Sequence, residues 1–330
     1  MYVLGIETSC DETACAILKN RKILSNVTFS SLRFHKRYGG IVPEIATRNH
    51  LKVINKVLTI TIKEANIPLK KIDVIGVTFK PGLVGALVVG LNFAKALALA
   101  LDKPFLGINH LYAHLFAPFL DNRLTIPFPF IGLVVSGGHT EIFLVNDFDY
   151  IKTVGKTRDD AAGEVFDKVA RTFGLGYPGG AYIDKIFRHR FKDYFKFKCG
   201  RLGLDFSFSG IKTALIYKKR ELEKQSVLTE EVKLKLLSSF QESLTKTIAD
   251  NAVLAAKIFK IKTLVCGGGV IANRRLRQIL KEQALKNNLK LYLSPRSLSS
   301  DNAAIVAGLT FYLYNKRGVK GNMGLEVEAH

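Results

Sequence analysis

Cysteine is scarce in this chain of 330 residues, and its four cysteines include no Cys-x-x-Cys pair. That spacing indicates reduced thiols rather than a disulfide framework. The first residues, MYVLGIETSCDET, begin directly with a strand pattern and then reach acidic side chains. We therefore expect no signal peptide at this end of the sequence.

Long uninterrupted apolar runs are also missing. The most apolar stretch, residues 85–101, contains Asn92 and Lys95. These interruptions favour a buried helix over a membrane span. We expect a soluble cytoplasmic protein that makes no membrane contact.

Three common catalytic signatures are absent. Residues 210–213 read Gly-Ile-Lys-Thr and lack the Gly-Lys-Ser/Thr order of a Walker A loop. No Gly-x-Ser-x-Gly elbow of the α/β-hydrolase type occurs. Leu111 stands where the His-Glu-x-x-His motif of zinc proteases has its glutamate base.

Acidic residues are outnumbered, 28 against 49 lysines and arginines, which gives a net charge of +21. A strongly basic protein favours a polyanionic partner such as nucleic acid, although a lysine-rich proteome would produce the same balance. Residues 188–201 interleave cations with aromatic side chains, which suits phosphate contacts and base stacking; a solvated basic face is the alternative.

A strand–turn–strand pattern occurs twice. Residues 2–18 contain a strand, a polar turn and a returning strand, and residues 130–145 repeat this layout after a Pro-Phe-Pro hinge at 127–129. Strands also alternate with helical patterns, which indicates an α/β fold. Two lobes that each open with such a hairpin are the plan of the actin/Hsp70/sugar-kinase superfamily, here an analogy of fold only.

Two of the seven histidines, His110 and His114, are four residues apart on an expected helix that Asn109 would cap. Side chains at this spacing share one helix face, so both imidazoles could reach one metal ion. Two surface histidines can also occur at this spacing by chance. Asp301, at the start of the final apolar helix, would complete a two-histidine, one-carboxylate site suited to Fe(II) or Zn(II), or act simply as a helix N-cap.

Longer motifs resemble those of the bacterial TsaD (Gcp/YgjD) family of tRNA N6-adenosine threonylcarbamoyltransferases. The resemblance covers almost the whole chain in the right order. The matching segments are residues 5–13, 109–114, 136–140, 159–180, 205–213, 266–273 and 300–304.

The resemblance implies an α/β protein with the two-lobed actin/Hsp70/sugar-kinase-like (ASKHA) fold, built from duplicated ribonuclease-H-like lobes with a central cleft. We expect residues 1–108 with 303–330 to form the N-terminal lobe and residues 109–302 the C-terminal lobe. The metal and the nucleotide would lie in the cleft between them.

The resemblance also implies an activity. The enzyme would transfer L-threonylcarbamoyl from threonylcarbamoyl-adenylate to N6 of the adenosine 3′ to the anticodon in ANN-decoding tRNAs, with release of AMP. His110, His114 and Asp301 would hold one divalent metal, Fe(II) in this family, with zinc or magnesium as alternatives. The residues expected to bind the donor are Val134, Val135, Ser136, Gly137, Gly138, Asp167, Gly180, Asp184 and Asn273.

The base that removes the N6 proton is assigned on position alone, to Asp11 or Glu12 in the first polar turn. A turn-stabilising contact is the alternative role for these residues. Expected partners are tRNA, a paralogous inactive ASKHA-fold protein (TsaB-like) and a small P-loop ATPase (TsaE-like).

Other functions fit the sequence less well. An ASKHA-type small-molecule kinase has no use for the paired histidines, and a metallopeptidase lacks the expected glutamate base. A non-catalytic RNA-binding scaffold would leave the long site motifs without a role.

Overall fold

The computed structural model describes residues 1–318 and 322–328, and the chain forms two compact units. The first unit contains Met1–Thr125 and Pro295–His330, and the second contains Ile126–Ser294. Residues 109–125 and 295–302, expected in the second lobe, thus lie in the first unit. The helix formed by residues 110–116 packs on the helix that begins at Ala303, which explains this placement. Residues 319–321 and 329–330 of the expected N-terminal lobe lie outside the described residues.

The first unit is built on a five-stranded sheet in the order β3-β2-β1-β4-β5. The strands are β1 (Tyr2–Glu7), β2 (Glu12–Lys19), β3 (Lys22–Ser30), β4 (Val74–Lys80) and β5 (Phe105–Asn109). The first three strands form an antiparallel meander, and β4 and β5 join β1 in parallel through helical crossovers.

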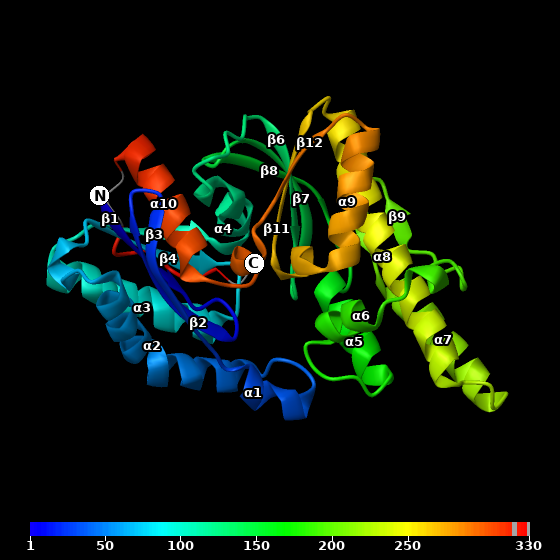
Figure 1. Ribbon diagram of the computed structural model, residues 1–330. Helices are drawn as coiled ribbons and strands as arrows, with labels where there is room; N and C mark the ends of the chain where they lie inside the picture. The colour runs from blue at the N-terminus through cyan, green and yellow to red at the C-terminus, as the bar shows by residue number, and fades with distance from the viewer. Residues whose placement is uncertain (319–321, 329–330) are drawn as a thin grey trace. The chain divides into compact units, whose positions relative to one another are not determined.

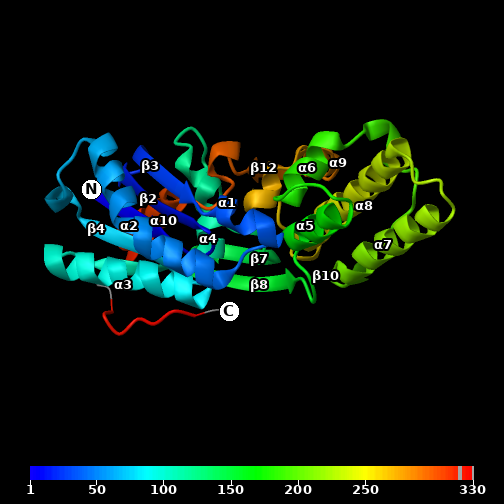
Figure 2. The same cartoon turned by 90° about the horizontal axis from the view of Figure 1, so that it is seen from below.

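Helices cover both faces of this sheet, α2 (Pro43–Ala65) and α3 (Val84–Leu101) on one and α10 (Ala303–Arg317) on the other (Figures 1 and 2). Alternate residues of β1 face opposite sides. Leu4 and Ile6 therefore join the core under α2 and α3, whereas a Cβ on Gly5 would collide with α10. The shorter helices are α1 (Leu32–His35), α4 (His110–Phe116), η1 (Lys36–Tyr38), η2 (Leu69–Lys71) and η3 (Ala117–Leu120).

The second unit repeats the topology, with a sheet in the order β12-β11-β6-β7-β8. Its strands are β6 (Phe130–Val135), β7 (Thr140–Asp147), β8 (Tyr150–Lys156), β11 (Thr263–Gly267) and β12 (Lys290–Leu293). Again an antiparallel meander is extended by two parallel strands. The expected duplication of a ribonuclease-H-like lobe is confirmed.

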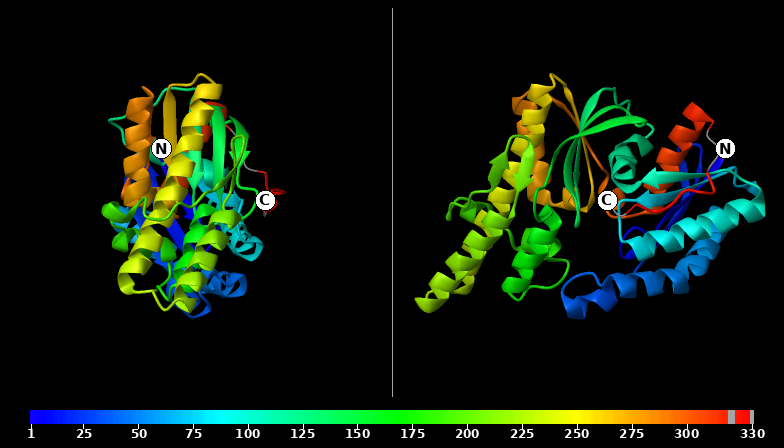
Figure 3. Two further views of the ribbon diagram at one scale, coloured as in Figure 1. Left: turned by 90° about the vertical axis from the view of Figure 1, so that its right-hand side faces the viewer. Right: turned by 180° about the vertical axis from the view of Figure 1, so that it is seen from behind.

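The helices of the second unit gather around α8 (Glu230–Ile258), which packs on α7 (Ser209–Lys224) and α9 (Arg274–Lys286) (Figure 3). Phe240, Leu244 and Ile248 of α8 lie in the core of this unit. The remaining elements are α5 (Ala162–Thr172), α6 (Gly179–Ile186), η4 (His189–Phe191), β9 (Gly200–Leu202), β10 (Asp205–Ser207), η5 (Gly269–Ala272) and η6 (Arg296–Leu298), of which η6 belongs to the first unit.

Helix α3 corresponds to the most apolar stretch of the sequence. By length and composition alone it is the one helix within residues 1–318 and 322–328 that could cross a membrane, and 33% of it is buried in the structure. It packs on β4 and α2, as expected of a crossover helix. It is less buried than expected, because Val84, Val88 and Leu99 remain exposed.

Candidate functional site

The paired histidines occupy α4, which begins directly after β5. The Asn109 side chain caps this helix by accepting hydrogen bonds from the backbone N–H groups of Leu111 and Tyr112, at 2.9 and 3.2 Å. This is the predicted N-cap. The rings of His110 and His114 lie edge to face with centroids 4.6 Å apart, so the predicted shared helix face is confirmed.

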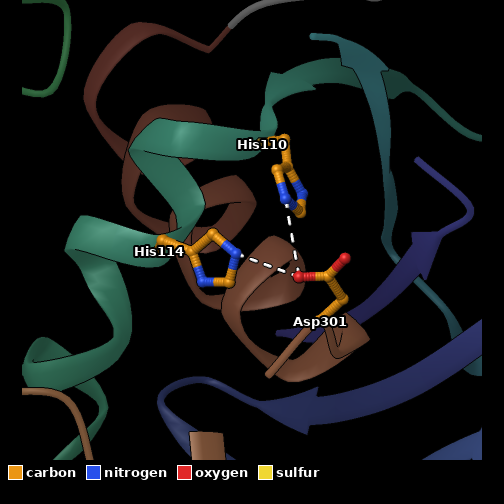
Figure 4. A group of neighbouring side chains, drawn as sticks. All are labelled: His110, His114 and Asp301. Atoms are coloured by element: carbon orange, nitrogen blue, oxygen red, sulfur yellow. Dashed lines mark hydrogen bonds and ion pairs between the residues drawn. The ribbon is translucent and has the colours of Figure 1, made fainter. Parts of the chain in front are cut away.

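Asp301 lies beside both histidines, just before α10 (Figure 4). Its Oδ1 is 3.1 Å from Nε2 of His114 and 3.6 Å from Nε2 of His110. Asn302, rather than Asp301, caps α10 by accepting from the Ile305 N–H. The carboxylate of Asp301 is therefore directed at the histidines, and all three residues belong to the first unit.

Glu7, the last residue of β1, is a member of this cluster that the sequence analysis missed. Its Oε2 is 3.1 Å from Nδ1 of His110 and accepts a hydrogen bond from Thr78 at 2.6 Å. The Ser9 hydroxyl lies 3.2 Å from the same Nδ1. The sequence did contain a signal for Glu7, because a glutamate at the end of an apolar strand and next to a polar turn is typical of a functional position.

Electrostatic coupling within the cluster is strong. Burial acts to lower the pKa of His110, but the carboxylates of Asp301 and Glu7 outweigh burial and raise it to about 9. Burial likewise acts to raise the pKa of Glu7, yet the charge and hydrogen bond of His110 lower it. The carboxylates of Asp301 and Glu7 thus stabilise the protonated, positively charged form of the buried His110 ring.

The same cluster fits a divalent metal. Ligand atoms of His110, His114 and Asp301 lie within 4.8 Å of one another. Glu7 occupies Nδ1 of His110, which leaves Nε2 for a cation, and metal-bound histidines commonly have such a carboxylate partner. Nδ1 of His114 is buried and has no hydrogen-bond partner within the described chain. Two nitrogens and one oxygen suit Fe(II) or Zn(II) better than magnesium, which prefers oxygen ligands.

Asp11 and Glu12, the expected bases, lie in the same unit at the end of the β1–β2 turn. Asp11 is 6% exposed, and its Oδ2 has no hydrogen-bond partner among the described residues. Burial, followed by the charges of Asp301 and Asp11, raises the pKa of Glu12 well above its usual value. His50 of α2 holds this turn, with Nδ1 2.7 Å from the Thr13 hydroxyl and Nε2 3.0 Å from the Cys10 carbonyl oxygen.

The residues predicted to bind the donor all lie in the second unit. Val134 and Val135 end β6, and Ser136, Gly137 and Gly138 form the turn into β7. The start of α5 packs on this turn, where the Gly163 and Glu164 N–H groups donate to the carbonyl oxygens of Ser136 and Gly137, at 3.2 and 3.1 Å. Gly268, after β11, has φ +99° and lies against Val135, where a Cβ would collide. The carboxyl ends of β6 and β11 therefore meet at two tight turns.

The remaining predicted donor residues continue from these turns. Asp167 accepts a hydrogen bond at 2.6 Å from the N–H of Gly179, the neighbour of Gly180 in the first turn of α6. Asp184, near the end of α6, accepts from the Arg274 N–H at 3.2 Å, at the start of α9. Asn273 caps α9, and its side-chain nitrogen is buried without a partner in the described chain. Contacts thus link the predicted donor residues through β6, α5, α6, α9 and β11.

Gln241 is a second residue missed by the sequence analysis. It is fully buried in α8, and its side-chain nitrogen donates to Oδ1 of Asp184 at 3.0 Å. No sequence pattern marks one polar side chain on the inner face of a long amphipathic helix as functional. Its partner becomes evident only when α6 and α8 pack together.

Comparison with known proteins gives consistent results. Residues 22–308 match the family model described as TsaD, tRNA N6-adenosine threonylcarbamoyltransferase. A protein of this name from Thermosipho africanus is 46% identical over 332 residues, covering 99% of this chain and 98% of the relative. Another from Dictyoglomus turgidum is 47% identical over 330 residues, covering 98% and 97% of the two chains.

Solved structures support the fold at much lower identity. Full-length HypF in its phosphate- and nucleotide-bound form has a TM-score of 0.61 and 14% identity, covering 95% of this chain and 46% of that chain. Component A of the Acidaminococcus fermentans (R)-2-hydroxyglutaryl-CoA dehydratase has a TM-score of 0.55 and 14% identity, covering 97% and 100%. At such identity these similarities concern the fold alone, and they agree with the ASKHA assignment.

Proposed function

The chain belongs to the TsaD family of tRNA N6-adenosine threonylcarbamoyltransferases, and we propose that it uses a metal in its first unit and a donor nucleotide in its second. The enzyme transfers a threonylcarbamoyl group to N6 of an adenosine in tRNA. The proposed donor is threonylcarbamoyl-adenylate, and the proposed acceptor is the adenosine 3′ to the anticodon of ANN-decoding tRNAs. N6 attacks the carbamoyl carbon, the bond from that carbon to the phosphate oxygen breaks, and AMP leaves with the electron pair.

The convergence of His110, His114 and Asp301 is the observation that carries the metal proposal. These residues would hold one divalent ion, Fe(II) first and zinc or magnesium as alternatives. A bound ion of this kind supplies Lewis-acid polarisation of a carbonyl oxygen. The chain itself contributes Glu7, which fixes the orientation of the His110 ring through Nδ1.

The adenylate would bind in the second unit. The turn at Ser136–Gly138 and the Gly267–Gly269 turn lie at the ends of β6 and β11, and in the proposal their glycine N–H groups bind a phosphate. The start of α9 adds a helix N-terminus, which also favours an anion. Asp167, Gly180, Asp184 and Asn273 would complete the donor site.

Asp11 and Glu12 remain the proposed acceptors of the N6 proton. Both lie at the end of the turn held by His50, in the same unit as the proposed metal ligands. In the proposal, either carboxylate takes the proton from N6 as the new C–N bond forms. Asp11→Asn and Glu12→Gln, assayed with pre-made donor, would assign the role, and full transfer by both variants would remove it.

A paralogous inactive ASKHA-fold protein and a small P-loop ATPase are proposed as protein partners. The exposed apolar residues Val84, Val88 and Leu99 of α3 support a protein contact. Co-sedimentation of the TsaB-like partner with wild type and with Leu99→Glu would test this, and equal binding would exclude Leu99 from the interface. A tRNA substrate also favours the cytoplasm as its location.

The decisive test follows the carbon label of threonylcarbamoyl-adenylate into tRNA, with ATP hydrolysis and peptide cleavage as parallel assays for a kinase or a peptidase. His114→Ala should lose both bound metal and label transfer. Retention of wild-type metal content by this variant, measured by elemental analysis, would refute the metal site. Peptide cleavage or ATP turnover without label transfer would refute the function.

A further inference from the structure

We propose that residues 188–198, here called the basic segment, form a surface that binds the phosphate backbone and one unstacked base of the tRNA. The inference rests on the proposed function, because its ligand is the acceptor substrate. The segment follows α6 and runs beside α8 toward β9 (Figure 1).

Four cations of the basic segment are uncompensated, whereas Nζ of Lys192 lies 3.8 Å from Oδ2 of Asp193. Arg188, Arg190, Lys196 and Lys198 are exposed, and none forms a salt bridge within the described residues. Lysines on the neighbouring helices differ, since several of them pair with glutamates one turn away. Those pairs are Lys218–Glu221, Lys219–Glu223, Lys233–Glu230 and Lys235–Glu231. The segment therefore presents four positive charges that no carboxylate of the described residues pairs with.

An aromatic ring lies among these cations. Tyr194 is 58% exposed, and Nζ of Lys235 lies 4.3 Å from its ring centroid. An exposed tyrosine beside cations is the arrangement on which single-stranded nucleic acids stack their bases. Phe191 differs, because it is 8% exposed and anchors the segment.

Buried serines fix the backbone of the segment. The Ser238 hydroxyl accepts from the Arg188 N–H at 3.0 Å, and the Ser239 hydroxyl accepts from the Phe195 N–H at 3.0 Å. Ser239 also donates to the Phe191 carbonyl oxygen at 2.9 Å. The two serines are 1% and 0% exposed, so these hydrogen bonds are shielded from water. The charges thus project from an ordered surface.

The same turn of α8 holds the proposed donor site. Gln241 donates to Asp184, and Glu242 pairs with Arg275 next to the α9 N-terminus, at 2.6 Å. Residues 238–242 of α8 therefore hold both the basic segment and a proposed donor residue. A polyanion on this surface would be positioned by the element that positions the nucleotide.

An acidic protein could also meet such charges, but the exposed ring of Tyr194 favours RNA. Base stacking uses an aromatic face together with cations, whereas recognition of acidic side chains requires only the cations. The two partner classes predict different results for one set of variants.

The test measures affinity of the full-length chain for an unmodified ANN-decoding tRNA transcript as a function of salt. The triple variant R190Q/K196Q/K198Q is compared with K257Q/K281Q/K286Q, which removes the same charge from exposed positions of α8 and α9. Loss of three phosphate contacts should make the negative slope of log K against log salt shallower by roughly 2 and weaken binding on the order of 10- to 100-fold at low salt. The control should retain the wild-type slope.

Tyr194→Leu should weaken binding by roughly 5- to 100-fold with the slope unchanged, and Tyr194→Phe should restore it. Equal tRNA affinity and slope for the segment variants and the control would overturn the proposal and leave an acidic protein as the ligand. Metal content and label transfer at saturating tRNA, measured on the same preparations, separate the two hypotheses. Failure of the wild type to transfer label would refute the proposed function. Normal label transfer together with unaffected tRNA binding by the variants would refute only the proposal that the basic segment binds tRNA.

Discussion

Nδ1 of His110 lies 3.1 Å from Oε2 of Glu7, while Nε2 of the same ring is 3.6 Å from Oδ1 of Asp301. One imidazole thus connects a fully buried carboxylate to the proposed metal position. Glu7 reaches this place because β1 alternates, so that its side chain shares a face with Gly5, on which α10 packs. The end of one strand therefore determines the orientation of a proposed ligand.

Glu7→Gln should weaken metal binding on the order of 10- to 100-fold while the fold persists, because the amide keeps the shape but removes the charge that orients His110. Metal affinity is measured by competition with a chelator, followed by elemental analysis. Glu44→Gln, which removes a glutamate from an exposed pair with Arg48, serves as the matched control. An affinity equal to that of the control would show that Glu7 has no influence on the metal.

The sequence predicted the site in part. His110 and His114 share a helix, so their spacing alone placed them on one face. Asp301 is 187 residues from His114, so its position at the start of the final apolar helix left a simple N-cap as an equal alternative, and the resemblance favoured the metal site. Glu7 and Gln241 were missed because their roles depend on how β1 meets α4 and how α6 packs on α8.

Asp167 provides a prediction for pH dependence. Burial raises the pKa of this carboxyl to about 6, although the Gly179 and Gly180 N–H groups act to lower it. A folded pKa above the unfolded value means that the folded state binds the proton more tightly, so this contribution to stability is present at low pH and is lost as pH rises through 6. Between pH 5 and pH 8 the loss amounts to about 1 kcal/mol.

Asp167→Asn cannot titrate and retains a carbonyl acceptor for the Gly179 N–H. The variant should therefore gain about 1 kcal/mol relative to wild type when pH is raised from 5 to 8. Urea unfolding at both pH values measures this double difference, in which the other titrating groups cancel. The same difference at both pH values would contradict the raised pKa.

The buried pair of Glu242 and Arg275 should be essential to the second unit. Arg275 donates to both carboxylate oxygens, at 2.6 and 2.7 Å, and the side chains are 9% and 4% exposed. Glu242→Gln leaves the buried guanidinium with only the longer contact to Glu282, at 3.8 Å, and should cost about 3–5 kcal/mol in the free energy of unfolding. Glu44→Gln breaks a surface pair and should cost at most about 0.5 kcal/mol. Urea denaturation measures both, and similar losses would refute the distinction.

Elements with strong apolar patterns were predicted, and weakly patterned ones were not. Helix α3 and the strand pairs β1–β2 and β6–β7 were expected close to their observed bounds. The outer strands β3 and β8 were missed, because their residues are mostly exposed or half-buried and show no alternation. Helix α6 begins at two glycines, which disfavour a helix, yet its first turn packs on Asp167 and Phe166 of α5.

The contact between α2 and α3 at Gly85 supports a final prediction. A Cβ at this position would lie 2.6 Å from the Thr47 hydroxyl oxygen but 3.5 Å from the Thr47 Cβ. Gly85→Ala alone should therefore destabilise the protein by about 1–3 kcal/mol through overpacking, despite the better helix propensity of alanine.

Thr47→Ala removes the obstructing atoms and leaves the 3.5 Å contact, which is an ordinary van der Waals distance. In that background Gly85→Ala should become neutral or stabilising by up to about 1 kcal/mol, because alanine restricts the unfolded chain. The sign change appears as a coupling energy in a double-mutant cycle of urea midpoints. Additive effects of the two substitutions would mean that Thr47 does not limit the space at Gly85, and that α3 packs less closely on α2 than these contacts indicate.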